Sequence, residues 1–268
     1  MTGRVAGAVL LLWLALALAG PWLALAPDRV DLDRLLEGPG EQAWLGHDDL
    51  GRPVWDRLVA GARVSLLVAV PVVSLSLLIG APVGALSAWR GGGWDLLTAR
   101  LVDVFLAFPG LLLAIALAGT LGPGLRNVVL ALACVGWVGF ARLARAQTLS
   151  LRSREHVQAA LALGVGETRI LFRHVLPLIA APLTVEATFA LAGAVVAEAS
   201  LSFLGLGVQP PTASWGSMIR DGTRYMLVAP HLVLAPGIAL ALVVLSVNLL
   251  GDRLRDRLDV RERAGRQG

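Results

Sequence analysis

Lysine is absent from this 268-residue sequence, and all 23 of its basic residues are arginine. A phosphate-binding P-loop requires a lysine in the pattern G-x-x-x-x-G-K-[ST], so the chain contains no ATP site of that kind. The only cysteine, Cys134, lies in an apolar run, which excludes an internal disulfide and a cysteine metal site. Arginines and stacking aromatics are not interleaved in any segment, so nothing indicates nucleic-acid binding.

Charged residues are also scarce. They make up 16% of the chain, whereas a soluble domain carries about 25%. Hydrophobic residues account for 56%, and the mean hydropathy is +0.73. They gather in blocks near the ~20 residues that cross the hydrocarbon core as a helix. Their runs show no period-two alternation, so the sequence predicts an all-α integral membrane protein.

The apolar blocks predict six transmembrane helices, at residues 5–26, 64–89, 101–121, 127–141, 178–198 and 227–250. The first block has a second interpretation as a secretory signal, because Arg4 precedes it and Ala-Leu-Ala at 24–26 resembles a cleavage site. A single basic residue and a long apolar run favour an uncleaved helix, which Pro21 is expected to kink near its outer end.

The arginines orient these helices. If the N-terminus is cytoplasmic, fifteen of the 23 arginines fall on the cytoplasmic side, in the segments 1–4, 90–100, 142–177 and 251–268. Positive residues collect on the cytoplasmic side of membrane proteins, so we expect both termini to be cytoplasmic. The tail 251–268 is expected to lie beneath the membrane and to touch anionic lipid.

One cytoplasmic segment, "EHVQAALALGVGETRILFRHVLP" at 155–177, is helix-like but too charged to cross a membrane. Gly164 is expected to end a first short helix, Glu167 to lie in the first turn of a second, and Pro177 to begin the fifth span. The first helix has an alanine-rich face that suits docking into a groove of a partner. The other interpretation is a solvated connecting loop.

The same segment carries the resemblance to a known family, the membrane permease subunits of bacterial ABC importers. Their cytoplasmic loop has E-A-A, three residues, G, nine residues, I, one residue and L-P. Here the positions with this spacing are Gln158, Ala159, Ala160, Gly164, Leu176 and Pro177. Two positions depart from the pattern, because Gln158 replaces the glutamate and His174 the isoleucine.

Further segments, at 44–68, 103–117, 197–219 and 248–259, resemble the dipeptide/oligopeptide/nickel subfamily. The resemblance implies a type I importer permease (MetI-like) architecture in which 155–177 couples to an ATPase. It implies four partners: a second homologous permease, two cytoplasmic ATPases and an extracytoplasmic binding protein. The expected parts are an N-terminal helix with its outer loop (1–63), a permease core (64–250) and a tail (251–268).

Two acidic residues within the fifth apolar block are candidates for the translocation path or its gate. Glu186 lies nine residues past Pro177, about 13 Å into the bilayer. A charge there is costly, so the side chain is expected to line a cavity or to form a hydrogen bond at a subunit interface. Glu198 lies near the outer end, where a gate or a scaffold contact is expected. In the outer segment 41–57, Asp48 or Asp49 is expected to cap the next element of the chain.

Two other function classes compete with a permease subunit. An intramembrane enzyme lacks support, because no H-E-x-x-H or G-x-S-x-G motif is present. An autonomous secondary transporter or channel would work without companions, and no internal repeat supports it. The substrate stays open among peptides, nickel complexes, opines and sugar-like solutes.

Overall fold

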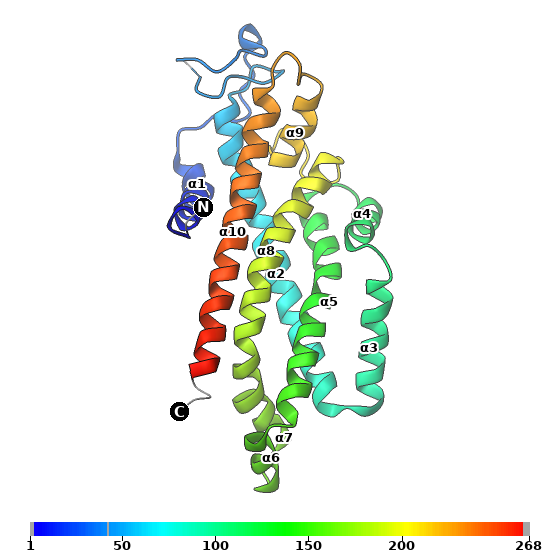
Figure 1. Cartoon of the computed structure of the whole chain (residues 1–268). Coiled ribbons are helices and arrows are strands. Elements are labelled where there is room, and N and C mark those ends of the chain that lie inside the picture. The colour runs from blue at the N-terminus through cyan, green and yellow to red at the C-terminus, as the bar shows by residue number, and fades with distance from the viewer. Residues whose placement is uncertain (1–2, 42, 265–268) are drawn as a thin grey trace.

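The computed structural model describes residues 3–41 and 43–264, so the last four residues of the expected tail lie outside it. The described chain is helical, with two isolated β-bridges in the 38–53 region and no strand. Long helices run side by side in one bundle (Figure 1). They are α2 (Val54–Arg90), α3 (Gly92–Leu106), α5 (Leu125–Arg152), α8 (Leu176–Phe203) and α10 (His231–Ala264). The shorter α1 (Gly3–Ala19) and α4 (Gly110–Leu121) lie at an angle to this bundle (Figure 1).

Shorter elements occupy both ends of this bundle. Two 3-10 turns, Gly20–Trp22 and Leu32–Arg34, precede α2, and α9 (Trp215–Thr223) precedes α10. At the opposite end, α6 (Glu155–Ala162) and α7 (Glu167–Ile170) form a hairpin between α5 and α8 (Figure 1). We call the end that carries residues 27–53 and α9 the loop end, and the end that carries the α6–α7 hairpin the hairpin end.

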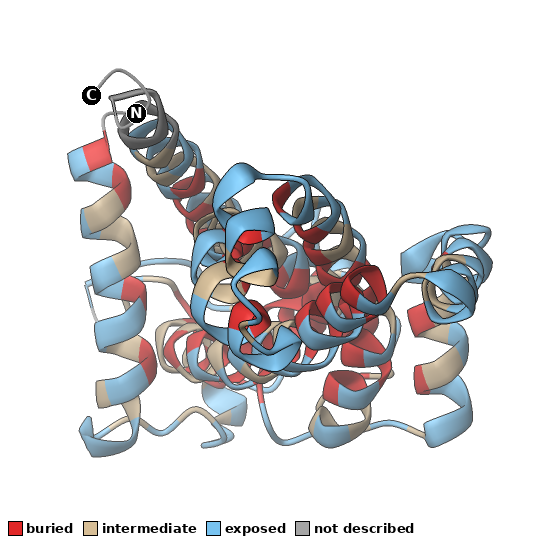
Figure 2. Ribbon diagram, turned by 90° about the horizontal axis from the view of Figure 1, so that it is seen from below, coloured by how far each residue is buried: buried red, intermediate tan, exposed pale blue. Residues whose placement is uncertain are grey.

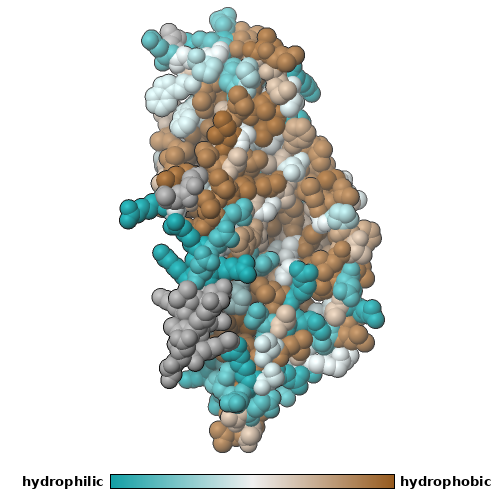
Figure 3. All heavy atoms as spheres, in the orientation of Figure 1, coloured by the Kyte–Doolittle hydropathy of each residue, from teal (hydrophilic) through white to brown (hydrophobic). Residues whose placement is uncertain are grey.

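The predicted all-α membrane fold is confirmed. Within the described residues, five helices are long and apolar enough to span a membrane, and a sixth span results if α3 and α4 count as one. The expected kink at Pro21 is also present, because α1 ends at Ala19 and a 3-10 turn carries the proline. Hydrophobic side chains cover much of the upper half and the right side of the molecule, whereas hydrophilic ones gather at its two ends and in a patch at mid-height on the left (Figure 3).

The third predicted span, 101–121, is wrong as one continuous helix. The chain bends by 84° between α3 and α4. Pro109 lies directly before α4 and has an extended backbone, because proline cannot continue the α3 hydrogen-bond pattern. Arg145 of α5 holds α3 in place through two hydrogen bonds to the Asp95 carboxylate, at 2.7 and 2.8 Å.

Other helices extend past their predicted limits. α5 runs well beyond 127–141, and α10 continues through residue 264. α2 begins at Val54, so the expected boundary between residues 63 and 64 falls inside a helix. Polar residues at these helix ends lower the local hydropathy without breaking the helix, which is why a hydropathy pattern alone underestimates their length.

The closest helix contact joins α2 to α5. Small buried residues recur every fourth position along one face of α2: Ser76, Gly80, Gly84 and Ala88. A Cβ atom at Gly80 would overlap the Trp137 carbonyl, and one at Gly84 would overlap the Ala141 carbonyl. Such small residues let two backbones approach closely, which favours association in lipid. Buried residues accordingly concentrate at the centre of the bundle (Figure 2).

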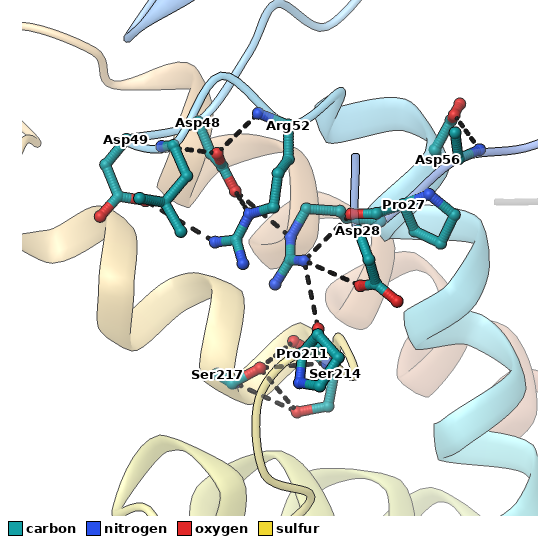
Figure 4. Close-up of polar contacts among 12 residues, drawn as sticks. Pro27, Asp28, Asp48, Asp49, Arg52, Asp56, Pro211, Ser214 and Ser217 are labelled. Carbon is teal, nitrogen blue, oxygen red and sulfur yellow. Dashed lines mark hydrogen bonds and ion pairs between the residues drawn. The ribbon is translucent and has the colours of Figure 1, made fainter. Parts of the chain in front are cut away.

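At the loop end, the side chain of Arg57 joins three segments of the chain. Its partners Pro27, Asp28, Asp48 and Pro211 are labelled in Figure 4. Its side chain is 5% exposed and lies 3.3 Å from the Asp48 carboxylate and 3.6 Å from Asp28. It also donates hydrogen bonds to the carbonyls of Pro27 and Pro211, at 3.2 and 3.4 Å. The loop 27–53 is therefore attached to α2 and to the segment before α9 through one guanidinium group.

The expected capping role belongs to Asp48, in a turn and not at a helix start. Its Oδ1 accepts hydrogen bonds from the amides of Leu50 and Arg52, both at 2.9 Å, and its Oδ2 accepts one from Arg52 Nε at 2.7 Å. The pKa of neighbouring Asp49 is raised, mainly by burial and to a lesser extent by the Asp48 carboxylate, while the Arg52 guanidinium lowers it. α2 itself begins after Pro53 without a side-chain cap.

Gly84→Ala tests the α2–α5 contact. The added methyl group has no room against the Ala141 carbonyl, so we expect a loss of about 1–3 kcal/mol in stability. Thermal unfolding of the detergent-solubilised protein measures this as a lower midpoint. Gly237→Ala in α10 is the control, because its added methyl group meets no atom within 4 Å. Equal midpoints for the two variants would contradict the close contact.

Arg57→Gln tests the attachment of the loop. The change removes the ion pairs of Arg57 with Asp28 and Asp48 and its hydrogen bonds to two carbonyls, while Asp48 keeps its contact with Arg52, so we expect a cost of about 1–3 kcal/mol. We expect faster hydrogen exchange at the amides of residues 27–53, measured by mass spectrometry. Arg29→Gln, in the same loop but at an exposed position, should leave the exchange unchanged. Unaltered exchange in the Arg57 variant would show that the loop is held by other contacts.

Candidate functional site

The hairpin begins as the sequence predicts, with two short helices around a glycine turn. α6 ends at Ala162, and Gly164 adopts a φ of +77°, in the left-handed region that glycine enters without strain. α7 then begins at Glu167, whose carboxylate lies in the first turn, where the helix dipole favours negative charge.

Pro177 lies in the first turn of α8, as expected, but α8 is not a separate helix, because α7 continues into it without a break. A π-helical turn at Leu171–Val175 joins the two, and the Leu176 amide donates to the Leu171 carbonyl. Proline lacks an amide hydrogen and clashes with the carbonyl four residues earlier. The wider turn accommodates Pro177, so the helix runs from residue 167 to 203.

One face of the hairpin is buried against the bundle. Val157 and Ile170 are fully buried, and they belong to a hydrophobic cluster with residues of α2, α5 and α8: Ala81, Ala85, Trp89, Phe140, Ala144, Leu151, Ile179 and Leu183. Burying a large aliphatic side chain contributes about 1.5–3 kcal/mol. The hairpin is therefore anchored to the same helices that form the α2–α5 contact.

The other face of the hairpin is open, and it carries most of the predicted docking residues. Gln158, Ala159 and Gly164 are exposed, while Ala160 is half-buried. Leu163, at the turn, is 83% exposed, which is unusual for a leucine outside a membrane. Leu176 is half-buried and Pro177 is exposed, at the base of α8. An apolar tip on an anchored support is suited to contact another protein.

The substitution of Gln158 for the family glutamate has a local consequence. Its side-chain amide donates a 2.8 Å hydrogen bond to the Arg152 carbonyl at the end of α5. A carboxylate has no hydrogen to donate and could not make this contact. Gln158 thereby satisfies one of the last backbone carbonyls of α5 and ties α6 to it.

Glu198, the second acidic candidate, is 1% exposed and joins α2 to α8. Its carboxylate accepts hydrogen bonds from Ser65 at 3.2 Å and from Ser202 at 2.7 Å. Both carboxylate oxygens thus have a partner within the chain, as buried polar groups require. Glu198 therefore links α2 to α8 through its hydrogen bonds, and its expected role as a gate or a scaffold contact stays a prediction.

Glu186, in contrast, faces an open groove. It is half-buried and lies against Gly139 of α5, where an added Cβ would be 3.3 Å from its Oε1. The groove lies between α5, α8 and α10 and has a volume of about 460 Å³. Its lining includes Gln147 and Arg255, which sequence reasoning did not single out; Arg255 gave no signal because it lies among other arginines of the tail.

A second cavity, of about 230 Å³, lies between α2, α4, α5 and α8. Its lining is apolar except for Ser76, whose hydroxyl is buried without a hydrogen-bond partner. The small side chains of α8 that face it are Ala190, Gly193, Ala194 and Ala197. Within the described part of the chain, no three His, Cys, Asp or Glu residues gather as metal ligands would.

Comparison with known proteins agrees with this architecture. The family model "Binding-protein-dependent transport system inner membrane component" matches residues 80–264, from the middle of α2 to the end of α10. A glutathione transport system permease protein, GsiD, of Pectobacterium atrosepticum is 41% identical over 256 residues, which cover 95% of this chain and 85% of the relative. GsiD of Escherichia coli is 41% identical over 251 residues, covering 93% and 83%.

Solved structures show the same fold. Two inward-facing crystal forms of the methionine ABC transporter MetNI match with TM-scores of 0.63 and 0.62 at 20% and 21% identity. Each match covers 76% of this chain and 97% of the MetNI chain. The family match and the 41% identity over nearly the whole length show that this chain belongs to the binding-protein-dependent transport system inner membrane components, the permease subunits of ABC importers.

Proposed function

We propose that this permease imports short peptides of the size of glutathione, with the hairpin 155–177 as its contact to the ATPase. The observation that carries the coupling role is the combination of a buried and an exposed face on one hairpin. The substrate class is supported by relatives named as glutathione permeases, because glutathione is a tripeptide. Nickel complexes are the other candidate substrates that the subfamily resemblance implies, but no observation on this chain favours them.

The proposed complex has five chains. This chain pairs with a second, homologous permease, two ATPase subunits bind at the hairpin end, and a binding protein docks at the loop end. ATP is hydrolysed on the ATPase subunits. The arrangement supports a cytoplasmic hairpin end in the bacterial inner membrane, because arginines concentrate in the segments at that end and in the tail.

Coupling follows from the way the hairpin is anchored. An ATPase that closes on nucleotide would displace α6 by contact with its exposed face. Val157 and Ile170 are packed on α2, α5 and α8, and α7 is continuous with α8, so the displacement moves these helices as one body. Such a rigid-body rotation opens the path to one side at a time, and it differs between the two nucleotide states of the ATPase.

The path itself is proposed to run along α5 and α8, past Glu186. Glu198 is proposed to hold α2 against α8 and not to contact the substrate. The core at residues 64–250 carries these functions, while residues 1–63 and the tail 251–268 flank it. An autonomous transporter or channel would purify alone and move solute without companions, whereas the proposed permease copurifies with its ATPases and companion permease.

Gly164→Arg tests the coupling contact. A bulky cation at the exposed turn, at a position that disfavours any side chain, is expected to block ATPase docking. We expect at least a tenfold loss of ATP-dependent glutathione uptake into proteoliposomes, together with loss of ATPase copurification.

Gly92→Arg is the matched control for this experiment. Gly92 is the exposed first residue of α3, has a φ of +59° and is likewise free of neighbours within 4 Å of an added Cβ. We expect it to retain uptake and copurification. If Gly164→Arg behaves like the control, the hairpin is not the ATPase contact.

Glu198→Gln and Glu198→Ala distinguish a scaffold from a gate. The glutamine can still pair with Ser65 and Ser202, so uptake and thermal stability should stay near normal. The alanine leaves two buried hydroxyls unsatisfied, which costs about 1–3 kcal/mol for each group. We therefore expect a lower unfolding midpoint for the alanine variant alone. Loss of uptake in a stable glutamine variant would instead identify Glu198 as a gate acid.

A further inference from the structure

The groove between α5, α8 and α10 contains two opposite charges that do not neutralise each other. Glu186 of α8 and Arg255 of α10 both line it, yet they form no ion pair with each other in the described structure. Gln147 of α5 adds a polar amide to the same wall. A half-buried carboxylate without a cation is costly at membrane depth, so such residues commonly mark a ligand or ion pathway.

The two charges come from neighbouring stretches of two helices that run in opposite directions. An added Cβ at Gly251 of α10 would lie 2.5 Å from the Thr188 hydroxyl of α8, so Glu186, two residues before Thr188, and Arg255, four residues after Gly251, lie at a similar level along the bundle. The groove is large enough to hold a small molecule, because its volume of about 460 Å³ is within the range of small-molecule sites. On the α5 side, an added Cβ at Gly139 would lie 3.3 Å from the Glu186 carboxylate, so a larger side chain there would crowd it.

We propose that this groove is a binding site for a zwitterion, with the ligand's ammonium group at Glu186 and its carboxylate at Arg255. Short peptides and amino acids have this chemistry, and Arg is the side chain best suited to bind a carboxylate. An extended dipeptide or tripeptide spans about 7–10 Å. The proposal rests on the proposed function, because it places a recognition site for the transported class on the permease wall.

The remaining lining, including Leu143, Val185 and Phe189, is apolar and can accommodate small aliphatic side chains.

The test uses the purified permease–ATPase complex in lipid nanodiscs without the binding protein. Calorimetric titration measures the binding of three probes: alanyl-alanine, its N-acetyl derivative and its C-terminal amide. We expect Glu186→Gln to weaken the binding of alanyl-alanine and of the amide at least tenfold, and to leave the affinity for the N-acetyl probe unchanged. We expect Arg255→Gln to weaken the binding of alanyl-alanine and of the N-acetyl probe, and to leave the affinity for the amide unchanged.

Arg257→Gln is the control, because Arg257 is exposed on the same helix and does not line the groove. It should bind all three probes as the unmodified complex does. The proposal is overturned if the unmodified complex does not bind alanyl-alanine, or if each variant weakens all probes equally. It is also overturned if native mass spectrometry finds phosphatidylethanolamine that is retained by the unmodified complex and lost in Arg255→Gln.

The outcome is separable from that of the proposed function. If Gly164→Arg abolishes uptake while probe binding shows no dependence on Glu186 or Arg255, the zwitterion site alone fails. If the charge-specific binding is found but Gly164→Arg retains uptake, the coupling role of the hairpin alone fails.

Discussion

The close contact between α2 and α5 is the constraint on which the rest of the structure depends. In lipid, apolar surface alone gives helices little reason to associate, so backbone proximity and interhelical hydrogen bonds have to hold the bundle together. The Ser76–Gly80–Gly84–Ala88 face provides that proximity. At one end of the pair, the hairpin packs on Ala85 and Ala144; at the other, Arg57 attaches the loop 27–53 to the start of α2.

This arrangement supports the proposed coupling of a permease that lacks a P-loop lysine to a separate ATPase. The hairpin is not a flexible connector, because its buried face belongs to the same hydrophobic cluster as α2, α5 and α8. α8 begins in the hairpin, passes the groove at Glu186 and ends near the Glu198 contact with Ser65. A displacement at one end of α8 therefore reaches both the wall of the proposed path and the loop end.

Much of the architecture could be predicted from the sequence, because the apolar blocks and the glycine turn are local signals. The bend between α3 and α4 was missed, since the run 101–121 is apolar throughout and only Pro109 marks the break. The continuous α7–α8 helix was missed because a π turn overrides the usual effect of Pro177. The groove needs three helices to meet, so no spacing in the sequence could bring Glu186 and Arg255 together. The four-residue spacing of small residues in α2, however, was available to sequence reasoning as a packing signal.

The most direct measurement of the central claim is a distance between spin labels at the two ends of the proposed rigid body. Labels at Leu163→Cys and Phe203→Cys, in a Cys134→Ser background, would mark the hairpin tip and the far end of α8, and all three native positions are exposed. The account predicts the same label-to-label distance in nucleotide-free and ATP-bound complexes, while the distance from Leu163→Cys to a label on the companion permease changes. A change of about 5 Å, one helical turn, within this chain would contradict it.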